Sequence, residues 1–595
     1  MNFFATGGSS FKAGIDLKFI VSSKSHGANF SADGQTLPQS LSTAREVFSR
    51  VEVGKIDFVL IGLAPDVLFR GGTVDENLSA LTEYVKLCVQ SGSKPVCVIF
   101  PVAPNIRDSY REKFVTTLRE ILSALKALCD FATVDLFDMP LAEGYFADDV
   151  QLNEQGRFFA SCALGLKLHE TILPFENLCN MTYAFFQVIL RTFGQKYFND
   201  LMRRVFAASA KKISRKDKIK IAFSMWDPSM WCGDELYNMF ANNPRFEPTI
   251  FLYMQAAADN EIKRRDLLKG VEKFKARGLN VVPVVEGETV IDKQDVLILL
   301  IPYPDWYPLA FETQVLTAET LVTYIPYTFE ISSINVYEWP VYEIGWKIFC
   351  ESKYNRRLAS VAARTGGANF YVSGYPKVDV FDEAEKFSFP WKMTRPDAKK
   401  IIWAPHHSLS NTPLYQNSTF EWNYKFMYEF AKSHPETSWV VKPHPRLLTK
   451  AVEYGLFPSV EAFEEYINAW NDLPNALFYT GAYYQDIFAT SDGMIQDSCS
   501  FLAEYQYTHK PMIYLTRDDQ PFNALGEEIL SASYCVDGQD LDAIAALMQK
   551  VFIEGDDPLK DARQKVFDEL LNYRLVNGMS ASEYIFRAIA DELGA

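Results

Sequence analysis

The chain has 595 residues, of which 48% are hydrophobic and 23% charged, with a formal net charge of −16. This length exceeds what one hydrophobic core supports, so several folded domains are expected, and the acidic charge argues against nucleic acid as a partner. No apolar run approaches the roughly 20 residues of a membrane span, no signal peptide is recognisable and the nine cysteines form no C-x-x-C pair, so we expect a cytoplasmic protein without a zinc site.

Short apolar runs alternate with amphipathic stretches along most of the chain, which is typical of parallel sheets covered by helices. We predict a first α/β domain over residues 1–170, followed by a helical connector over 171–215 that ends in a basic stretch. The alternation resumes over residues 216–370 and again over 371–595. The predicted fold class is therefore α/β, with two doubly wound units after the first domain.

Histidines follow two predicted strands of the last unit. The strand TSWVV leads into a segment that contains Lys442, His444 and Arg446. Flanking prolines keep this segment out of the sheet. His444 can therefore donate to a phosphate oxygen, while Lys442 and Arg446 offset the negative charge of the phosphate. Another strand leads into His406 and His407, and on an extended chain at most one of two neighbours faces a ligand. The alternative is a turn histidine that satisfies a loop carbonyl.

A third predicted strand, DGMIQ, leads into Asp497, Ser498, Cys499 and Ser500 just before a helix. A serine at a helix start caps the helix, and with the free backbone N–H groups it forms an anion site. The alternative is a plain N-cap. Because ligands of open α/β sheets bind outside the carboxyl ends of the strands, we expect Asp497, Ser498 and Ser500 to line a phosphate site with the histidines.

Four motifs occur in a fixed order: SGYPKVDVF, APHHS, KPHP, and SDGMIQDSCS followed by HKPMIYL. Together they resemble the CDP-glycerol glycerophosphotransferases, the teichoic acid polymerase and primase family, over residues 216–595. The resemblance implies a GT-B fold, an acceptor lobe followed by a nucleotide donor lobe. It implies that His444 contacts the donor's pyrophosphate, and that Asp497 and Ser500 line the same pocket. Ser498 and Cys499 depart from the family's Asp-Tyr-Ser-Ser motif.

The base that activates the acceptor is not inherited through this resemblance. Where the family often has Trp-His-Gly-Thr-Pro, this chain has YIPYTFE over residues 324–330. Tyr327, Glu330 or a histidine of the other lobe, such as His407, remains as the catalytic base, and the choice stays open. The change also indicates that the transferred group or the acceptor differs from glycerol phosphate and a teichoic chain.

The first domain resembles an SGNH hydrolase whose catalytic set is incomplete. Ser10 stands at the place of the nucleophile, and Asp148 and Gln151 stand at the places of the acid and the base. Glutamine cannot take the proton of a serine, so we expect a binding or assembly module rather than a hydrolase. His26 or His169 would restore activity only by folding into the pocket.

The resemblance implies phosphotransfer, in which an acceptor hydroxyl attacks the β-phosphorus of a CDP-linked donor and CMP leaves. The expected acceptor is a bacterial surface glycan, such as a capsule, lipooligosaccharide or teichoic-type chain, and the cargo is glycerol phosphate, methyl phosphoramidate or a similar group. We expect no cofactor and no metal. If the acceptor is lipid-linked, the protein would contact the membrane peripherally. Two alternatives remain: a GT-B glycosyltransferase that uses a nucleotide sugar, and a non-catalytic glycan-binding scaffold.

Overall fold

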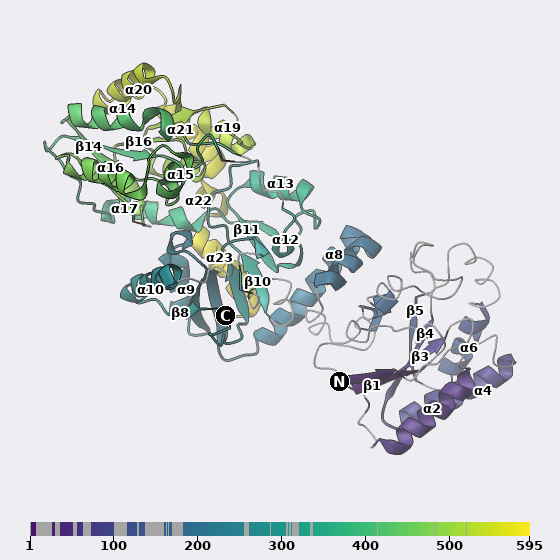
Figure 1. Cartoon of the computed structure of the whole chain (residues 1–595). Coiled ribbons are helices and arrows are strands. Elements are labelled where there is room, and N and C mark those ends of the chain that lie inside the picture. Colours follow the sequence, from purple (N-terminus) through teal and green to yellow (C-terminus); the bar gives the residue numbers. More distant parts are fainter. Residues whose placement is uncertain are drawn as a thin grey trace. The chain divides into compact units, whose positions relative to one another are not determined.

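The fold is described from a computed structural model of the chain (Figure 1). Two compact units are present, one made mainly of Met1–Lys212 and the other of Ile213–Thr313 and Thr320–Ala595. From residue 183 onward the structure describes every residue except 255–260, 286, 305–306, 309–310, 312–319, 334–336, 413–414, 482 and 519. Before residue 183 it describes 2–6, 26–29, 36–51, 56, 58–63, 73–99, 116–127, 130–136, 160–161, 163–164 and 166–168.

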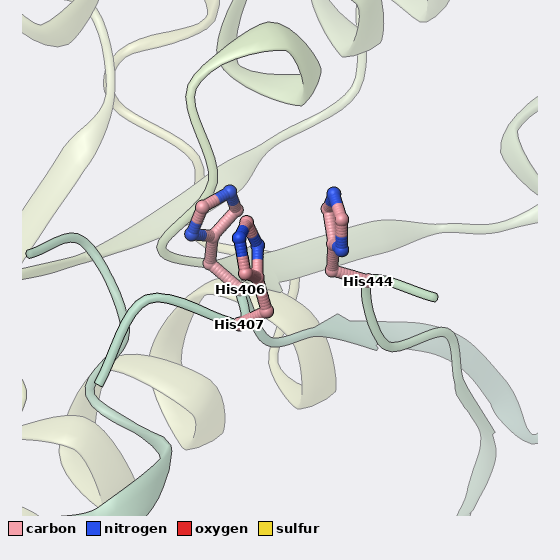
Figure 2. Close-up of side chains that lie close together, drawn as sticks. All are labelled: His406, His407 and His444. Atoms are coloured by element: carbon pink, nitrogen blue, oxygen red, sulfur yellow. The ribbon is translucent and has the colours of Figure 1, made fainter. Parts of the chain in front are cut away.

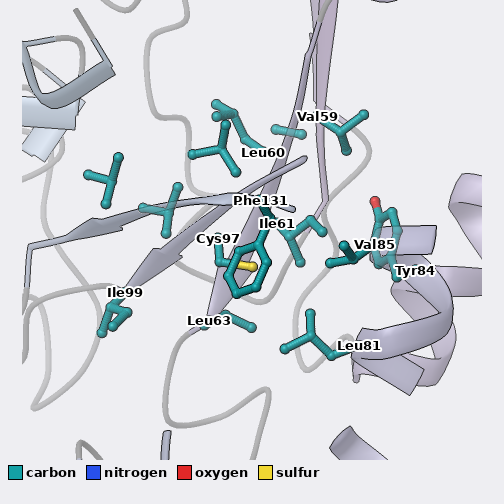
Figure 3. Packing of buried hydrophobic residues seen from close by; sticks show 14 of the residues in the cluster. Val59, Leu60, Ile61, Leu63, Leu81, Tyr84, Val85, Cys97, Ile99 and Phe131 are labelled. Carbon is teal, nitrogen blue, oxygen red and sulfur yellow. The ribbon is translucent and has the colours of Figure 1, made fainter. Parts of the chain in front are cut away.

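The described part of the first unit is built on a parallel sheet with the strand order β2-β1-β3-β4-β5. Leu81, Tyr84 and Val85 of α4 join Ile61 of β3 and Cys97 of β4 in its hydrophobic core (Figure 3). Such continuous burial is typical of parallel strands that are covered on both faces. The elements are β1 (Asn2–Thr6), β2 (His26–Asn29), α2 (Leu37–Arg50), β3 (Phe58–Leu63), α4 (Val74–Gln90), β4 (Lys94–Ile99), α6 (Thr116–Lys126) and β5 (Ala132–Asp135).

The predicted SGNH-like site cannot be compared with this sheet, because Ser10, Asp148, Gln151 and His169 lie outside the described residues. The α/β character of the unit is confirmed, and its SGNH-like assignment stays a prediction. Helix α8 (Tyr183–Ile213) follows, with a kink at Gly194, whose φ of 79° suits a residue without Cβ. Among the described residues, no helix combines the length and the apolar character needed to cross a membrane.

The second unit contains two parallel sheets. The first lobe has the strand order β12-β11-β10-β9-β6-β7-β8. Its strands are β6 (Ile219–Met225), β7 (Phe246–Tyr253), β8 (Val281–Val284), β9 (Val296–Leu299), β10 (Leu321–Tyr324), β11 (Lys347–Cys350) and β12 (Phe370–Val372). The helices between them are η5 (Pro228–Met230), α9 (Asp234–Asn242), α10 (Glu261–Ala276), α12 (Pro340–Ile344) and α13 (Lys353–Ala362).

The second lobe has the strand order β15-β14-β13-β16-β17-β18, again with every pair parallel. Its strands are β13 (Lys399–Ala404), β14 (Thr437–Val441), β15 (Ala476–Phe478), β16 (Gly493–Gln496), β17 (Met512–Thr516) and β18 (Tyr534–Asp537). In both lobes the first strand lies beside the fourth, which is the doubly wound arrangement. The predicted α/β class with two Rossmann-like lobes is therefore confirmed, and this pair of lobes has the GT-B architecture.

Short helices connect the strands of the second lobe and complete the chain. They are η9 (Pro376–Lys386), α14 (Phe420–Ser433), α15 (Leu447–Tyr454), α16 (Val460–Asp472), α17 (Gln485–Thr490), α18 (Ser500–Glu504), η10 (Tyr505–Thr508), α19 (Ala524–Leu530), α20 (Leu541–Leu547), η11 (Met548–Ile553), α21 (Lys560–Val566), η12 (Phe567–Leu571), α22 (Tyr573–Asn577) and α23 (Ala581–Leu593).

The last helix, α23, returns to the first lobe. The rings of Phe586 in α23 and Phe240 in α9 lie 5.1 Å apart, and the hydroxyl of Ser580, the N-cap of α23, donates to the carboxylate of Glu235 in α9 over 3.2 Å. The sequence prediction assigned all of residues 371–595 to the second lobe. It did not anticipate this return, because an amphipathic pattern shows that a helix is half buried but not which sheet it covers.

Candidate functional site

Three loops meet at one edge of the second-lobe sheet. Strand β13 lies between β14 and β16, and all three run parallel, so their carboxyl ends share this edge. We call the segments 405–408, 442–446 and 497–500, which follow these strands, the histidine edge. It lies at the point where the strand order reverses, and this is where doubly wound sheets bind their ligands.

Three imidazoles lie side by side on the histidine edge, and we call His406, His407 and His444 the imidazole triad (Figure 2). The ring centroids of His407 and His444 are 4.0 Å apart, those of His406 and His407 4.3 Å, and those of His406 and His444 5.1 Å. The expectation that only one of His406 and His407 faces the site was wrong. Strand β13 ends at Ala404, and the backbone bends at His407.

Hydrogen bonds fix the tautomer of two triad members. The backbone N–H of Arg446 donates to Nδ1 of His444 over 3.1 Å, and that of Ser408 donates to Nδ1 of His406 over 3.2 Å. A backbone N–H can only donate, so in a neutral ring the proton is on Nε2. Nδ1 of His407 is buried and has no hydrogen-bond partner among the described residues. The triad thus presents Nε2–H donors beside an unpaired nitrogen.

The triad is electrically neutral in the free protein at neutral pH. Burial lowers the pKa of all three imidazoles, that of His407 to about 4. After burial, the neighbouring imidazoles contribute to the lowered pKa values of His406 and His444, and the positive charges of Arg446, Lys442 and Lys450 contribute as well. Positive potential therefore gathers on this edge although the whole chain is acidic, and this is what a local anion site requires.

The three side chains also lie close enough to bind a metal ion, with their nitrogen ligand atoms within 4.8 Å of one another. No spacing pattern in the sequence predicts such a group, because its members come from two separate loops. A metal would need an unprotonated Nε2 on His406 and His444, whereas the hydrogen bonds to their Nδ1 atoms favour the protonated form. The geometry therefore suits an anion better than a cation.

Asp497 is buried and hydrogen-bonds to the loop that carries His406. Its carboxylate is 1% exposed and accepts hydrogen bonds from the backbone N–H of His406 and from the backbone N–H and hydroxyl of Thr419, over 2.6, 2.6 and 2.9 Å. Burial raises the pKa of Asp497 to about 6. The expected phosphate-binding role does not match this position, because a buried carboxylate with its oxygens occupied holds the loop rather than an anion.

Ser498 and Ser500 lie on the same edge and are partly exposed. The expected capping by Ser500 was wrong: Cys499 occupies the N-cap position of α18, no side chain caps this helix, and Ser500 is its first residue. Residue 499 already has helical backbone angles, so the hydroxyl of Ser500 is one position too late to cap.

The two predicted cations differ in exposure. Arg446 is exposed beside the triad, whereas Lys442 is buried and its ammonium donates to the carbonyl of Pro443 over 3.3 Å. Burial and the nearby charge of Lys377 lower the pKa of Lys442 to about 8. Arg446 is therefore the cation that can reach a ligand without rearrangement, and Lys442 contributes charge from within the protein.

Tyr327 and Glu330 of the first lobe lie within electrostatic reach of second-lobe residues near this edge. Besides burial, the charge of Glu330 raises the pKa of Cys499. Burial raises the pKa of Tyr327, and Tyr415 of the second lobe contributes to this shift. The ring of Tyr415 lies 6.2 Å from that of His406. Sequence reasoning missed Tyr415, whose only signal was its place in the polar loop after the adjacent histidines.

The lowered histidine pKa values predict a pH-dependent stability. Below the unfolded value of about 6.5, the unfolded chain binds protons that the folded triad does not, so stability decreases as pH falls from 6.5 toward 4 and is retained above 6.5. His407→Gln is expected to reduce the loss between pH 7 and pH 5 by up to about 2 kcal/mol. Calorimetry at both pH values measures this, and equal losses in the two proteins would contradict it.

Three solved structures are similar to this chain. The wall teichoic acid polymerase TagF is 13% identical, with a TM-score of 0.38 over 69% of this chain and 95% of that chain. The UDP-GlcNAc 2-epimerase from Neisseria meningitidis bound to UDP-GlcNAc is 14% identical, with a TM-score of 0.38 over 58% of this chain and 94% of that chain. S. aureus MnaA with UDP is 12% identical, with a TM-score of 0.39 over 63% of this chain and 97% of that chain. No protein-family model and no curated protein matches the chain. Similarities this low assign no activity.

Proposed function

We propose that the second unit is a transferase that binds a CDP-linked donor at the histidine edge and moves its phospho-linked group to a hydroxyl of a bacterial surface glycan. The observation that supports this proposal is the imidazole triad, in which hydrogen bonds to Nδ1 of His406 and His444 leave Nε2–H as the donor of each ring. A pyrophosphate supplies several acceptor oxygens for such donors, and Arg446 can offset its charge. The four sequence motifs favour CDP-glycerol chemistry in particular.

In the proposed reaction, the acceptor oxygen forms a bond to the β-phosphorus while the bond between that phosphorus and the oxygen of CMP breaks. Charge grows on the departing CMP, where the triad donors and Arg446 stabilise it. The acceptor's proton passes to a base. Burial and the neighbouring Glu330 raise the pKa of Tyr327, so this phenol stays protonated and is better suited to donate a hydrogen bond. Glu330 and His407 remain as the base.

Product analysis tests the proposal. Incubation with CDP-glycerol and a glycan acceptor is expected to release CMP and to form a phosphodiester, detected by ³¹P NMR and mass spectrometry. Release of a nucleoside diphosphate from a nucleotide sugar would instead support a glycosyltransferase, and glycan binding without turnover would support a scaffold. EDTA is expected to leave the rate unchanged, because we propose no cofactor and no metal. Loss of activity in EDTA that zinc restores would assign the triad to a metal.

A further inference from the structure

A hollow lies between the two lobes of this unit, at the carboxyl ends of β6 and β15, with a volume of about 510 Å³. The first lobe supplies the segment after β6 and the end of α10, and the second lobe supplies η9 and the segment after β15. Its principal lining residues are Trp231, Asp234, Arg277, Lys377, Tyr483 and Gln485. Neither the sequence motifs nor the proposed donor chemistry assigns it a role.

Lys377 connects this hollow with the histidine edge. Its side chain is buried, its ammonium donates to the carbonyl of Ser229 over 2.8 Å, and it lies 5.0 Å from the ring centroid of Tyr484. Its charge is also among the causes that lower the pKa of Lys442, which precedes His444 by two residues. Lys377 of the hollow and Lys442 of the histidine edge are therefore close enough for their charges to interact.

Aromatic rings and fixed polar groups line the hollow. Asp234 accepts a hydrogen bond from Nε1 of Trp231 over 2.8 Å and pairs with Arg277, whose Nε donates to it over 3.1 Å. Tyr483 of the second lobe is 45% exposed and lines the same hollow as Arg277 and Asp234 of the first lobe. In such a site the aromatic ring can pack on the C–H face of a sugar, while the carboxylate and the guanidinium hydrogen-bond to the sugar's hydroxyls.

We propose that this hollow binds a sugar residue of the acceptor, held between Tyr483 and the Arg277–Asp234 pair, with the rest of the acceptor reaching toward the triad. Its role as an acceptor subsite rests on the proposed function, whereas the binding of a sugar ring does not. The ligand of this hollow is a pyranose, because hydroxyls around a ring match the mixed donors and acceptors of the wall. The acceptor then lies mainly against the first lobe and the donor against the second.

Saturation-transfer difference NMR tests the proposal with three probes: methyl α-D-glucopyranoside, methyl β-D-galactopyranoside and methyl N-acetyl-β-D-glucosaminide. We expect at least one to receive saturation from the wild-type chain, with the signal reduced at least about fivefold in Tyr483→Ala. Tyr454→Ala is the matched control, because Tyr454 is 38% exposed in the same lobe and does not line the hollow. Arg277→Ala is a second variant that removes the opposite wall.

Calorimetric titration with CDP on the same proteins separates this proposal from the proposed function. CDP affinity is expected to be unchanged in Tyr483→Ala, since the triad is intact. If no probe binds to the wild type, or if Tyr483→Ala and Arg277→Ala bind a probe as well as Tyr454→Ala does, the sugar site is wrong whatever the CDP result. Sugar binding that is lost in both wall variants, together with no CDP binding to the wild type, would keep the sugar site and overturn the donor site.

Discussion

Replacement of His444 by alanine is expected to lower kcat for donor turnover by about 10²- to 10³-fold, which is the effect of removing one preorganised hydrogen-bond donor from a developing negative charge. His444 contributes such a donor because the backbone N–H of Arg446 occupies its Nδ1. The ring also lies 4.0 Å from that of His407, so its loss removes one of the two imidazoles beside His407. The rate of CMP release at saturating CDP-glycerol measures the effect.

Two companion variants make this result specific to hydrogen-bond donation. His444→Gln keeps an N–H donor on a side chain of similar reach, so it is expected to recover at least tenfold of the lost rate, whereas a metal ligand or a proton acceptor would not be replaced by an amide. His434→Ala is the matched control, because His434 ends α14, contacts the Phe430 carbonyl and stacks on the Phe430 ring. Equal losses in His434→Ala and His444→Ala would contradict a role for the triad.

Much of this edge could be predicted from the sequence, since apolar runs that end in polar residues identify strands and the carboxyl ends of parallel strands share one edge. Its internal geometry could not. Whether His406 and His407 face the same way depends on a bend beyond the strand, and the direction of Asp497 depends on Thr419, which is 78 residues away in sequence. Short-range patterns do not encode such distant contacts, so binding and supporting residues looked alike.

For the same reason, the surroundings of the first-lobe site residues could not be predicted from the sequence. The segment YIPYTFE is distinguished in the sequence only by its departure from a motif. Tyr303 and Tyr415, which lie near Tyr327 of this segment, belong to separate loops. Lys377 is part of a motif that supported the resemblance, yet its burial beside Ser229 becomes visible only when both lobes are present. A site between two lobes is assembled by tertiary packing, and the sequence lists its parts without their distances.

Asp497→Ala is expected to destabilise the second lobe by about 3 to 5 kcal/mol, because it leaves the N–H of His406 and the N–H and hydroxyl of Thr419 buried without an acceptor. Donor binding should weaken as well, since His406 loses the contact that fixes its backbone. Asp497→Asn keeps one oxygen acceptor and is expected to lose less stability. Differential scanning calorimetry and CDP titration measure the two effects.

The comparison with an exposed aspartate decides between support and ligand contact. Asp518→Ala in the same lobe removes an exposed carboxylate and is expected to leave both the unfolding temperature and CDP affinity unchanged. If Asp497 bound the donor itself, Asp497→Ala would lose CDP affinity at an unchanged unfolding temperature. A joint loss of stability and affinity, graded from alanine to asparagine, instead follows from a carboxylate that acts on the donor only through the loop carrying His406.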